Sequence, residues 1–248
     1  MQDALVPQPP DRPLECLSVG AGRPLVLLHG FLLQPRIYLP LAELLADRAQ
    51  VLIPSIFALP GRWTFDHAIG CLEATLDEMG VARVSLLGHS FGGGLELGLA
   101  ARRPERIVEC VFGDTLGVRE RFGLANEALR HPFGILRMAS PSAAGAFVES
   151  VATHPAQLVA AGLWGFTSHR EPEIDAVVAR DIPCHVLWAS RDTLLDRADG
   201  REFARRLHAT FTVAEAPPGY GPLDHDWMFA DAPVFAAHLD RLGLYALS

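Results

Sequence analysis

The stretch "VSLLGHSFGGGLELGLA", Val84 to Ala100, places Ser90 between glycines where an apolar run gives way to a helical pattern. A tight strand-to-helix turn strains the backbone of its central residue and crowds the residues two positions away. Gly88 and Gly92 occupy those positions, and neither carries a Cβ atom that would clash. The Ser90 hydroxyl should then point into a crevice at a helix N-terminus, where backbone N–H groups favour negative charge. We predict that Ser90 is a nucleophile whose reaction passes through an oxyanion.

The G-x-S-x-G pattern around Ser90 is weak when taken alone. A chain with this glycine and serine content contains the pattern by chance in roughly one case in ten. The simpler interpretation is that Ser90 only caps the helix that follows. The expected strand before Ser90 and helix after it favour the interpretation of Ser90 as a nucleophile over that of a helix cap.

The elements that must position Ser90 alternate between apolar runs and helical patterns. Continuous hydrophobicity, typical of parallel strands buried on both faces, marks Pro24–Gly30, Gln50–Ser55, Arg83–Gly88, Arg106–Asp114, Cys184–Ser190 and Thr210–Ala216. Helices are expected at Leu39–Arg48, Phe65–Met79, Phe91–Arg103, Gly200–His208 and Pro233–Leu242, the last with Asp231 as its cap. This alternation predicts an α/β fold with a doubly wound, mostly parallel sheet. Ligands of such sheets bind outside the carboxyl ends of the strands, which is where Ser90 lies.

One segment, from about Leu116 to Arg180, interrupts this alternation. It shows no clear strand and reads as short helices broken by prolines, with aromatic residues that include Phe133 and Trp164. We interpret residues 116–180 as a helical cap inserted after the strand that ends near Asp114, within a single domain spanning residues 1–248. The alternative is that the apolar residues of this segment only form the cap's own core.

With these elements in place, the chain resembles the α/β-hydrolase fold superfamily, whose esterase- and lipase-like members use a serine nucleophile. The resemblance rests on G-x-S-x-G at Ser90 and on "LLHGF", Leu27–Phe31, which matches the family's H-G motif at the end of an early strand. The family order is serine, acid, histidine. The resemblance therefore implies Asp192, after "HVLWAS", as the acid and His225, in "LDHDWMFADAP", as the base.

The resemblance also assigns the groups around the nucleophile. It implies an oxyanion hole made by the backbone N–H groups of Phe31 and Phe91. His89, beside the nucleophile, is expected in the scaffold or the pocket wall. Phe133 and Trp164 of the cap are further candidates for lining the substrate pocket.

Several alternatives concern the acid and a metal. Asp114 is the alternative acid, because the family sometimes uses that strand end. Asp224, His225 and Asp226 could be imagined as a metal cluster, but their apolar context and the lack of a partner set argue against it, so we expect no metal. Asp224 stands where the family usually has glycine, and Ser55 stands where it often has aspartate. Both departures leave the subfamily and the substrate open.

The expected function is a serine hydrolase that cleaves a small, moderately hydrophobic carboxylic ester, thioester or lactone through an acyl-enzyme, without a cofactor. The same triad would also support a C–C bond hydrolase, an acyltransferase or another biosynthetic enzyme. A further alternative is a non-catalytic, ligand-binding homologue. Serine at position 90 argues against a dehalogenase or epoxide hydrolase with a nucleophilic aspartate.

The amino-acid composition limits the classes of partner and of chemistry that the chain can use. The chain has 248 residues, of which 50% are hydrophobic and 20% charged, which favours one large domain with a substantial core. Its net charge of −8 argues against nucleic acid and anionic membranes as partners. All 21 basic residues are arginine, which excludes Schiff-base and Walker-type lysine chemistry and points to a GC-rich bacterial genome.

Cysteine use and the N-terminus bear on localisation. The cysteines are Cys16, Cys71, Cys110 and Cys184. They are few, far apart and in apolar surroundings, which favours free thiols in a reducing compartment. The N-terminal "MQDALVPQPPDRPLE" lacks the basic start and apolar core of a signal peptide. We expect a cytoplasmic enzyme, monomeric or homodimeric, whose partner is a small-molecule substrate.

Overall fold

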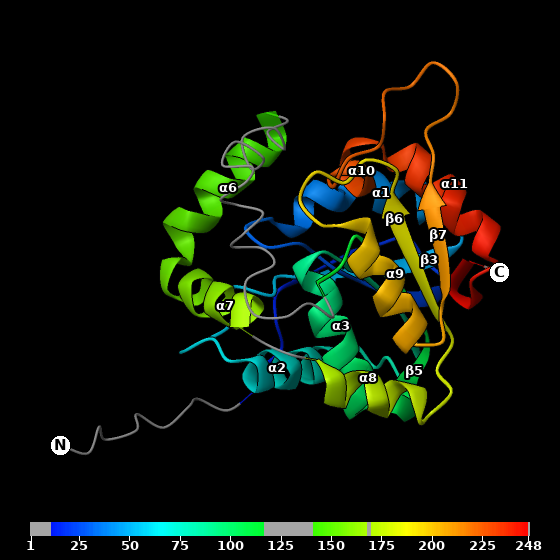
Figure 1. The fold of residues 1–248 in the computed structure, drawn as a ribbon. Coiled ribbons are helices and arrows are strands. Elements are labelled where there is room, and N and C mark those ends of the chain that lie inside the picture. Colours follow the sequence, from blue (N-terminus) through cyan, green and yellow to red (C-terminus); the bar gives the residue numbers. More distant parts are fainter. Residues whose placement is uncertain (1–10, 117–140, 168–169, 248) are drawn as a thin grey trace.

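The computed structural model describes residues 11–116, 141–167 and 170–247 (Figure 1). Within them, seven strands form one sheet in the order β1-β3-β2-β4-β5-β6-β7. The strands are β1 Cys16–Val19, β2 Arg23–Leu28, β3 Ala49–Pro54, β4 Val84–His89, β5 Ile107–Gly113, β6 Cys184–Ala189 and β7 Thr210–Ala214. Only β1 runs antiparallel to its neighbour, β3, and the other pairs are parallel. The expected doubly wound, mostly parallel sheet is confirmed.

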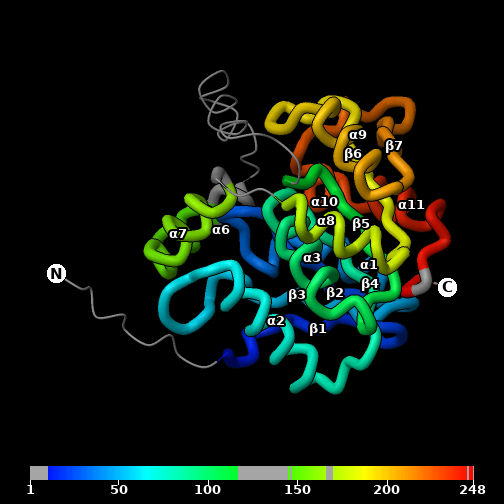
Figure 2. Tube along the Cα trace, turned by 60° about the horizontal axis from the view of Figure 1, so that its bottom comes forward, coloured from blue at the N-terminus to red at the C-terminus, as the bar shows by residue number. Residues whose placement is uncertain are grey.

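Helices cover both faces of this sheet, which explains why its strands are continuous apolar runs. The described helices are α1 Leu39–Leu45, α2 Phe65–Glu78, α3 Phe91–Arg102, α6 Pro141–Thr153, α7 Pro155–Thr167, α8 Glu171–Val178, α9 Arg197–Arg206, α10 Trp227–Ala230 and α11 Ala232–Leu242. Strand β4 is buried at all six positions, with Leu86 in the core that includes α2, α3, α8 and α9. Leu87, on the opposite face, belongs to the core with α1, α10 and α11 (Figures 1 and 2).

The structure adds two elements that the sequence pattern did not predict. Strand β1 is a four-residue edge strand with exposed central residues, and α10 is a four-residue helix directly before α11. Asp231 occupies the N-cap position of α11 but makes no capping hydrogen bond with its side chain, contrary to expectation. The reason is that its N–H still bonds to Trp227 O as part of the last turn of α10. Its backbone therefore lacks the extended geometry that an N-cap residue adopts.

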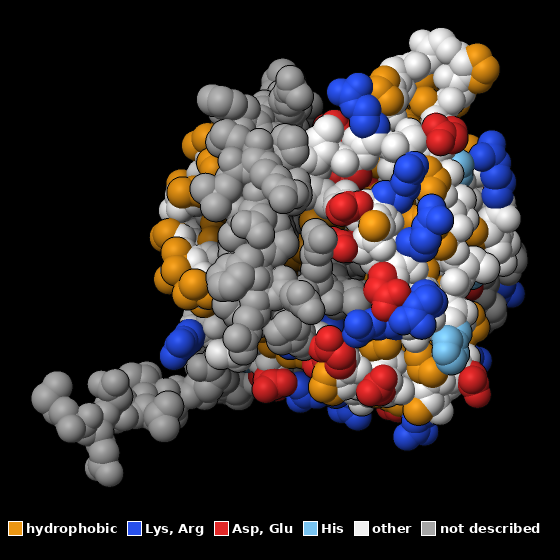
Figure 3. Space-filling view, viewed as in Figure 1, with side chains coloured by type: hydrophobic (Ala, Val, Ile, Leu, Met, Phe, Trp, Pro, Cys, Tyr) orange, Lys and Arg blue, Asp and Glu red, His pale blue; other side chains and the backbone are white. Residues whose placement is uncertain are grey.

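Helices α6, α7 and α8 lie between β5 and β6, in the segment expected to form the cap. Helix α8 packs against α3, whereas α6 and α7 stand to one side (Figure 2). There, α7 meets the start of α2 through Trp164 and Phe65, and α6 packs against the short helical turn Pro35–Tyr38. Leu158 and Ala161 of α7 are buried. Figure 3 shows hydrophobic side chains at the left edge of the molecule, where α6 and α7 lie. The exposed large apolar side chains of these two helices are Phe147, Val148, Val151, Val159 and Leu163. Phe133 lies outside the described residues.

The thiols are free, as expected, with Cys71, Cys110 and Cys184 buried and Cys16 partly buried. No described helix is long and apolar enough to cross a membrane.

Candidate active site

The corner between β4 and α3 is built around Ser90. Its φ of 52° and ψ of −117° lie in a region that residues with side chains rarely adopt. Backbone hydrogen bonds hold this conformation, from Ser90 N–H to Gly113 O (3.0 Å) and from Leu116 N–H to Ser90 O (3.1 Å). Thr115 Oγ1 also donates to Ser90 O at 3.0 Å. The strained turn expected at Ser90 is therefore present, and its surroundings determine it.

The glycines around Ser90 are required by close approach. A Cβ at Gly92 would lie 2.0 Å from Leu28 O, and a Cβ at Gly88 would lie 2.6 Å from Gly93 Cα. Neither neighbour can yield, because both are backbone atoms of the central strands and of α3. The steric reason given for the G-x-S-x-G spacing thus holds in three dimensions.

The candidate acid and base, Asp192 and His225, meet across two loops at the same sheet edge. Asp192 follows β6, and His225 precedes α10. His225 Nδ1 lies 2.9 Å from Asp192 Oδ2, and the side chains are 4% and 1% exposed, respectively. Because a carboxylate only accepts, Nδ1 carries the proton and Nε2 keeps the lone pair of a base. Asp192 Oδ1 accepts from the N–H groups of Leu194 (2.7 Å) and Leu195 (2.9 Å), which fixes the carboxylate.

The charges of this pair support each other. Burial alone would raise the pKa of Asp192, but the neighbouring His225 and the loop N–H groups lower it below its ordinary value. Burial alone would lower the pKa of His225, but Asp192, helped by Asp224 and Asp226, raises it above its ordinary value. The site therefore favours the imidazolium–carboxylate state that a proton-accepting histidine must reach.

Asp224 links the two loops. Its Oδ1 accepts from Thr193 N–H (2.9 Å), Thr193 Oγ1–H (2.8 Å) and His225 N–H (2.8 Å). This role of Asp224 was not predicted from the sequence, where the residue stood out as a departure from the family's glycine and as a member of an improbable metal cluster. No local pattern connects Asp224 with Thr193, so the contact becomes visible only in the folded chain.

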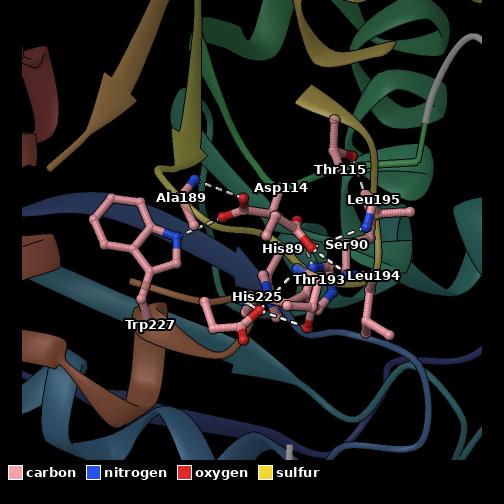
Figure 4. Close-up of polar contacts among 12 residues, drawn as sticks. His89, Ser90, Asp114, Thr115, Ala189, Thr193, Leu194, Leu195, His225 and Trp227 are labelled. Atoms are coloured by element: carbon pink, nitrogen blue, oxygen red, sulfur yellow. Dashed lines mark hydrogen bonds and ion pairs between the residues drawn. The ribbon is translucent and has the colours of Figure 1, made fainter. Parts of the chain in front are cut away.

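Asp114, the alternative acid, is engaged elsewhere. It is fully buried and accepts from Ala189 N–H (2.8 Å) and from Trp227 Nε1–H (Figure 4). Burial, and then the nearby Asp192 carboxylate, raise the pKa of Asp114 well above its ordinary value. A carboxyl that tends to be neutral is a poor partner for an imidazolium. The geometry favours Asp192 over Asp114 as the partner of His225.

The two backbone N–H groups expected to form the oxyanion hole are available. The Phe91 N–H is at the first position of α3, where a helix leaves its N–H groups unpaired. Phe31 follows Gly30, whose carbonyl accepts from Leu33 N–H (3.3 Å) and faces His29 Nδ1 (3.1 Å). Because the carbonyl and N–H of a trans peptide point in opposite directions, the Phe31 N–H points away from these contacts. Neither N–H donates to another described residue.

His29 holds this loop through contacts of both ring nitrogens with backbone groups. It is 1% exposed, and its Nε2 accepts from Ile56 N–H at 3.3 Å. Burial lowers the pKa of His29 to about 4, so the ring stays neutral. The proposed reaction does not use His29.

The two described pocket candidates lie in different environments. Trp164 of α7 stacks on Phe65 with ring centroids 4.8 Å apart and meets Phe91 edge-on at 5.2 Å. His89 is 1% exposed, and its ring nitrogens lie 2.6 Å from Tyr38 Oη and 2.9 Å from His225 O. Trp164 thus contacts the residue that follows Ser90, whereas the contacts of His89 are those of a scaffold residue, the other role that the resemblance allows.

Two clusters of described side chains bring three possible metal-ligating atoms within 4.8 Å of one another, namely Asp114, Asp192 and His225, and Asp11, His67 and Cys71. In the first, the hydrogen bonds described above already engage these atoms. In the second, burial raises the pKa of the Cys71 thiol, and a metal requires the thiolate. We propose no metal at either cluster.

Comparison with known proteins shows which family the chain resembles. Residues 25–238 match the model of the alpha/beta hydrolase family. A protein of Mycobacterium phage D29, whose name describes a candidate non-heme haloperoxidase, is 26% identical over 261 residues, covering 93% of this chain and 90% of that protein. A 2-hydroxymuconate semialdehyde hydrolase from Pseudomonas putida is 46% identical over 57 residues, which span 23% of this chain and 18% of that protein.

A solved structure shows the same fold over nearly the full length. A thermophilic esterase from Thermogutta terrifontis superposes with a TM-score of 0.75 at 19% identity, covering 95% of this chain and 94% of that one. At this identity the likeness concerns the fold.

The Asp192–His225 pair makes a titration testable. We expect NMR to show the His225 imidazole titrating above its ordinary pKa, and Asp192→Asn to lower that pKa, because burial then acts without the compensating charge. Asp114→Asn is the matched control and should leave the His225 titration nearly in place. An unchanged His225 pKa in Asp192→Asn would contradict the pairing.

Proposed function

Because the chain belongs to the alpha/beta hydrolase family, we propose that it is a serine hydrolase that cleaves a small, moderately hydrophobic carboxylic ester, thioester or lactone. The observation that carries this proposal is the hydrogen bond from His225 Nδ1 to Asp192 Oδ2 (2.9 Å), at the edge of the sheet where the strained Ser90 lies. It leaves His225 Nε2 as a base at the same edge as the serine hydroxyl.

Acylation uses this arrangement directly. His225 Nε2 takes the proton of Ser90 as its Oγ attacks the substrate carbonyl, and the carbonyl π electrons move onto oxygen. The N–H groups of Phe31 and Phe91 stabilise that oxyanion, and Asp192 stabilises the imidazolium. The tetrahedral intermediate collapses, the bond to the alcohol or thiol breaks, and His225 returns the proton to the leaving group.

Deacylation repeats the sequence with water. His225 takes a proton from a water molecule as that water attacks the acyl carbon, and the same N–H groups hold the second oxyanion. When this intermediate collapses, Ser90 Oγ leaves and recovers its proton from His225. The products are a carboxylic acid and the free enzyme, and no cofactor enters the cycle.

The proposed substrate is small and moderately hydrophobic because aromatic side chains surround the corner. Phe31 lies 5.7 Å from Phe91, ring centroid to ring centroid, and Phe57 lies 5.8 Å from Phe31. Trp164 adds an apolar surface from α7. We therefore propose that residues 116–180 form a cap of a single domain and that Trp164 limits the space for the acyl group.

A second candidate is hydrolysis of a C–C bond with the same residues. It is favoured by the local similarity to a 2-hydroxymuconate semialdehyde hydrolase, 46% identical over 57 residues. Turnover of 2-hydroxymuconate semialdehyde well above that of small esters would favour this candidate, and turnover of esters alone would exclude it.

The nucleophile is tested by Ser90→Ala. We expect this variant to lose hydrolysis of p-nitrophenyl acetate by at least about 10⁴-fold, because the covalent step is removed. It should also lose labelling by a fluorophosphonate probe, while circular dichroism stays unchanged.

Ser18→Ala, an exposed serine on β1, is the matched control and should keep both signals. Labelling or near-normal turnover in a folded Ser90→Ala protein would contradict the serine mechanism.

The role of Trp164 is tested with a series of p-nitrophenyl esters of increasing acyl length. We expect kcat/KM to rise with chain length and then fall, and Trp164→Ala to shift the optimum towards longer chains, because it enlarges the space beside Phe91. Val159→Ala, an exposed position on the same helix, should leave the optimum in place. A profile that Trp164→Ala does not move would show that Trp164 takes no part in selection.

A further inference from the structure

A chain of hydrogen bonds runs from the loop after β2 to the loop before α10. Gly30 N–H lies 3.0 Å from Tyr38 Oη, and Tyr38 Oη lies 2.6 Å from His89 Nδ1. His89 Nε2 in turn lies 2.9 Å from the backbone oxygen of His225. The chain therefore joins the residue before Phe31, the residue before Ser90 and the proposed base.

We propose that Tyr38 and His89 are positioning residues. They hold the loop that carries Phe31 and the loop that carries His225 in place relative to Ser90, through hydrogen bonds in which the position of every proton is fixed. This inference rests on the proposed serine hydrolase function. It assigns to two residues outside the triad a part in the rate of the chemical steps.

The direction of every hydrogen bond follows from the two ends of the chain. The His225 carbonyl can only accept, so His89 Nε2 must carry a proton. In a neutral ring, Nδ1 then accepts, and the donor to it must be the Tyr38 hydroxyl. The Tyr38 oxygen in turn accepts from Gly30 N–H, which can only donate. One arrangement of protons satisfies all three contacts.

Burial keeps both members of the chain neutral. Tyr38 is 0% exposed and His89 1% exposed. Burial, and then the neighbouring His225, lower the pKa of His89 to about 3, although Asp192 acts in the opposite sense. Burial raises the pKa of the Tyr38 phenol. The ring of His89 lies 5.0 Å from that of His225, so a neutral His89 spares the developing imidazolium a repulsive neighbour.

Each end of this series of hydrogen bonds holds a residue beside or within the proposed reacting groups. At one end, Leu33 N–H holds the Gly30 carbonyl, which belongs to the same peptide as the Phe31 N–H, and Tyr38 holds the N–H of the preceding peptide, so Gly30 is fixed on both sides of its Cα. At the other end, His89 holds the backbone of His225 (Figure 4). Asp192 holds the His225 ring. Small displacements of such groups cost rate, because the reaction requires them within a narrow range of positions.

The test uses three variants in the full chain. Tyr38→Phe removes only the hydroxyl. His89→Gln places an amide N–H near the position of Nε2 and keeps a donor for His225, whereas His89→Asn places an amide oxygen near Nδ1 and keeps an acceptor for Tyr38. Tyr220→Phe, at a loop tyrosine that is 57% exposed, is the matched control.

The readout is kcat for p-nitrophenyl acetate per active site, with sites counted by a fluorophosphonate burst. This count separates positioning from folding, because a merely structural role lowers the number of titratable sites or Tm without lowering kcat per site. We expect Tyr38→Phe to lower kcat per site by about 10- to 100-fold with little change in KM. Both His89 variants should also lower it, and Tyr38→Phe with His89→Gln should cost less than the product of the single losses.

Unchanged kcat per site in Tyr38→Phe, within twofold of the wild type, would overturn the proposal while leaving the hydrolase function in place. If Tyr38→Phe does not fold, unchanged kcat per site in both His89 variants overturns it equally. A wild-type chain that neither hydrolyses the ester nor reacts with the fluorophosphonate would remove the function itself and this inference with it.

Discussion

The hydrogen bond between His225 Nδ1 and Asp192 Oδ2 is the constraint on which the site depends. By placing the proton on Nδ1, it leaves Nε2 free to accept the Ser90 proton in the proposed reaction. Both side chains are almost fully buried, so each charged form is stable only because the partner's charge compensates for the cost of burial. An isolated His225 would lose basicity here, and an isolated Asp192 would tend to become neutral.

The sheet brings these groups together, and buried polar contacts hold them there. Ser90, Asp192 and His225 follow different strands whose carboxyl ends share one edge of a parallel sheet. Asp224 then links the loop that carries His225 to Thr193, in the loop that carries Asp192. Asp114, nearby, accepts from Ala189 and Trp227 rather than from His225, which lets two close carboxyl groups coexist in different states.

Much of the fold could be predicted from the sequence, because buried parallel strands are continuous apolar runs and the Ser90 turn imposes its own glycine spacing. β1 and α10 were missed because four residues show too little periodicity to be recognised. Tyr38 was missed for another reason, since its partner His89 is 51 positions away, and His89 is 136 positions from His225. Contacts at such separations leave no local pattern, so they appear only when the strands are assembled.

The measurement that tests the account most directly is kcat/KM for a short p-nitrophenyl ester in Asp192→Asn and Asp114→Asn, side by side. Each change removes one carboxyl charge at the same edge of the sheet, but only Asp192 bonds to His225. The account predicts a loss of about 10⁴-fold for Asp192→Asn and a much smaller loss for Asp114→Asn. An inactive Asp114→Asn beside an active Asp192→Asn would contradict it and move the acid of the triad to the end of β5.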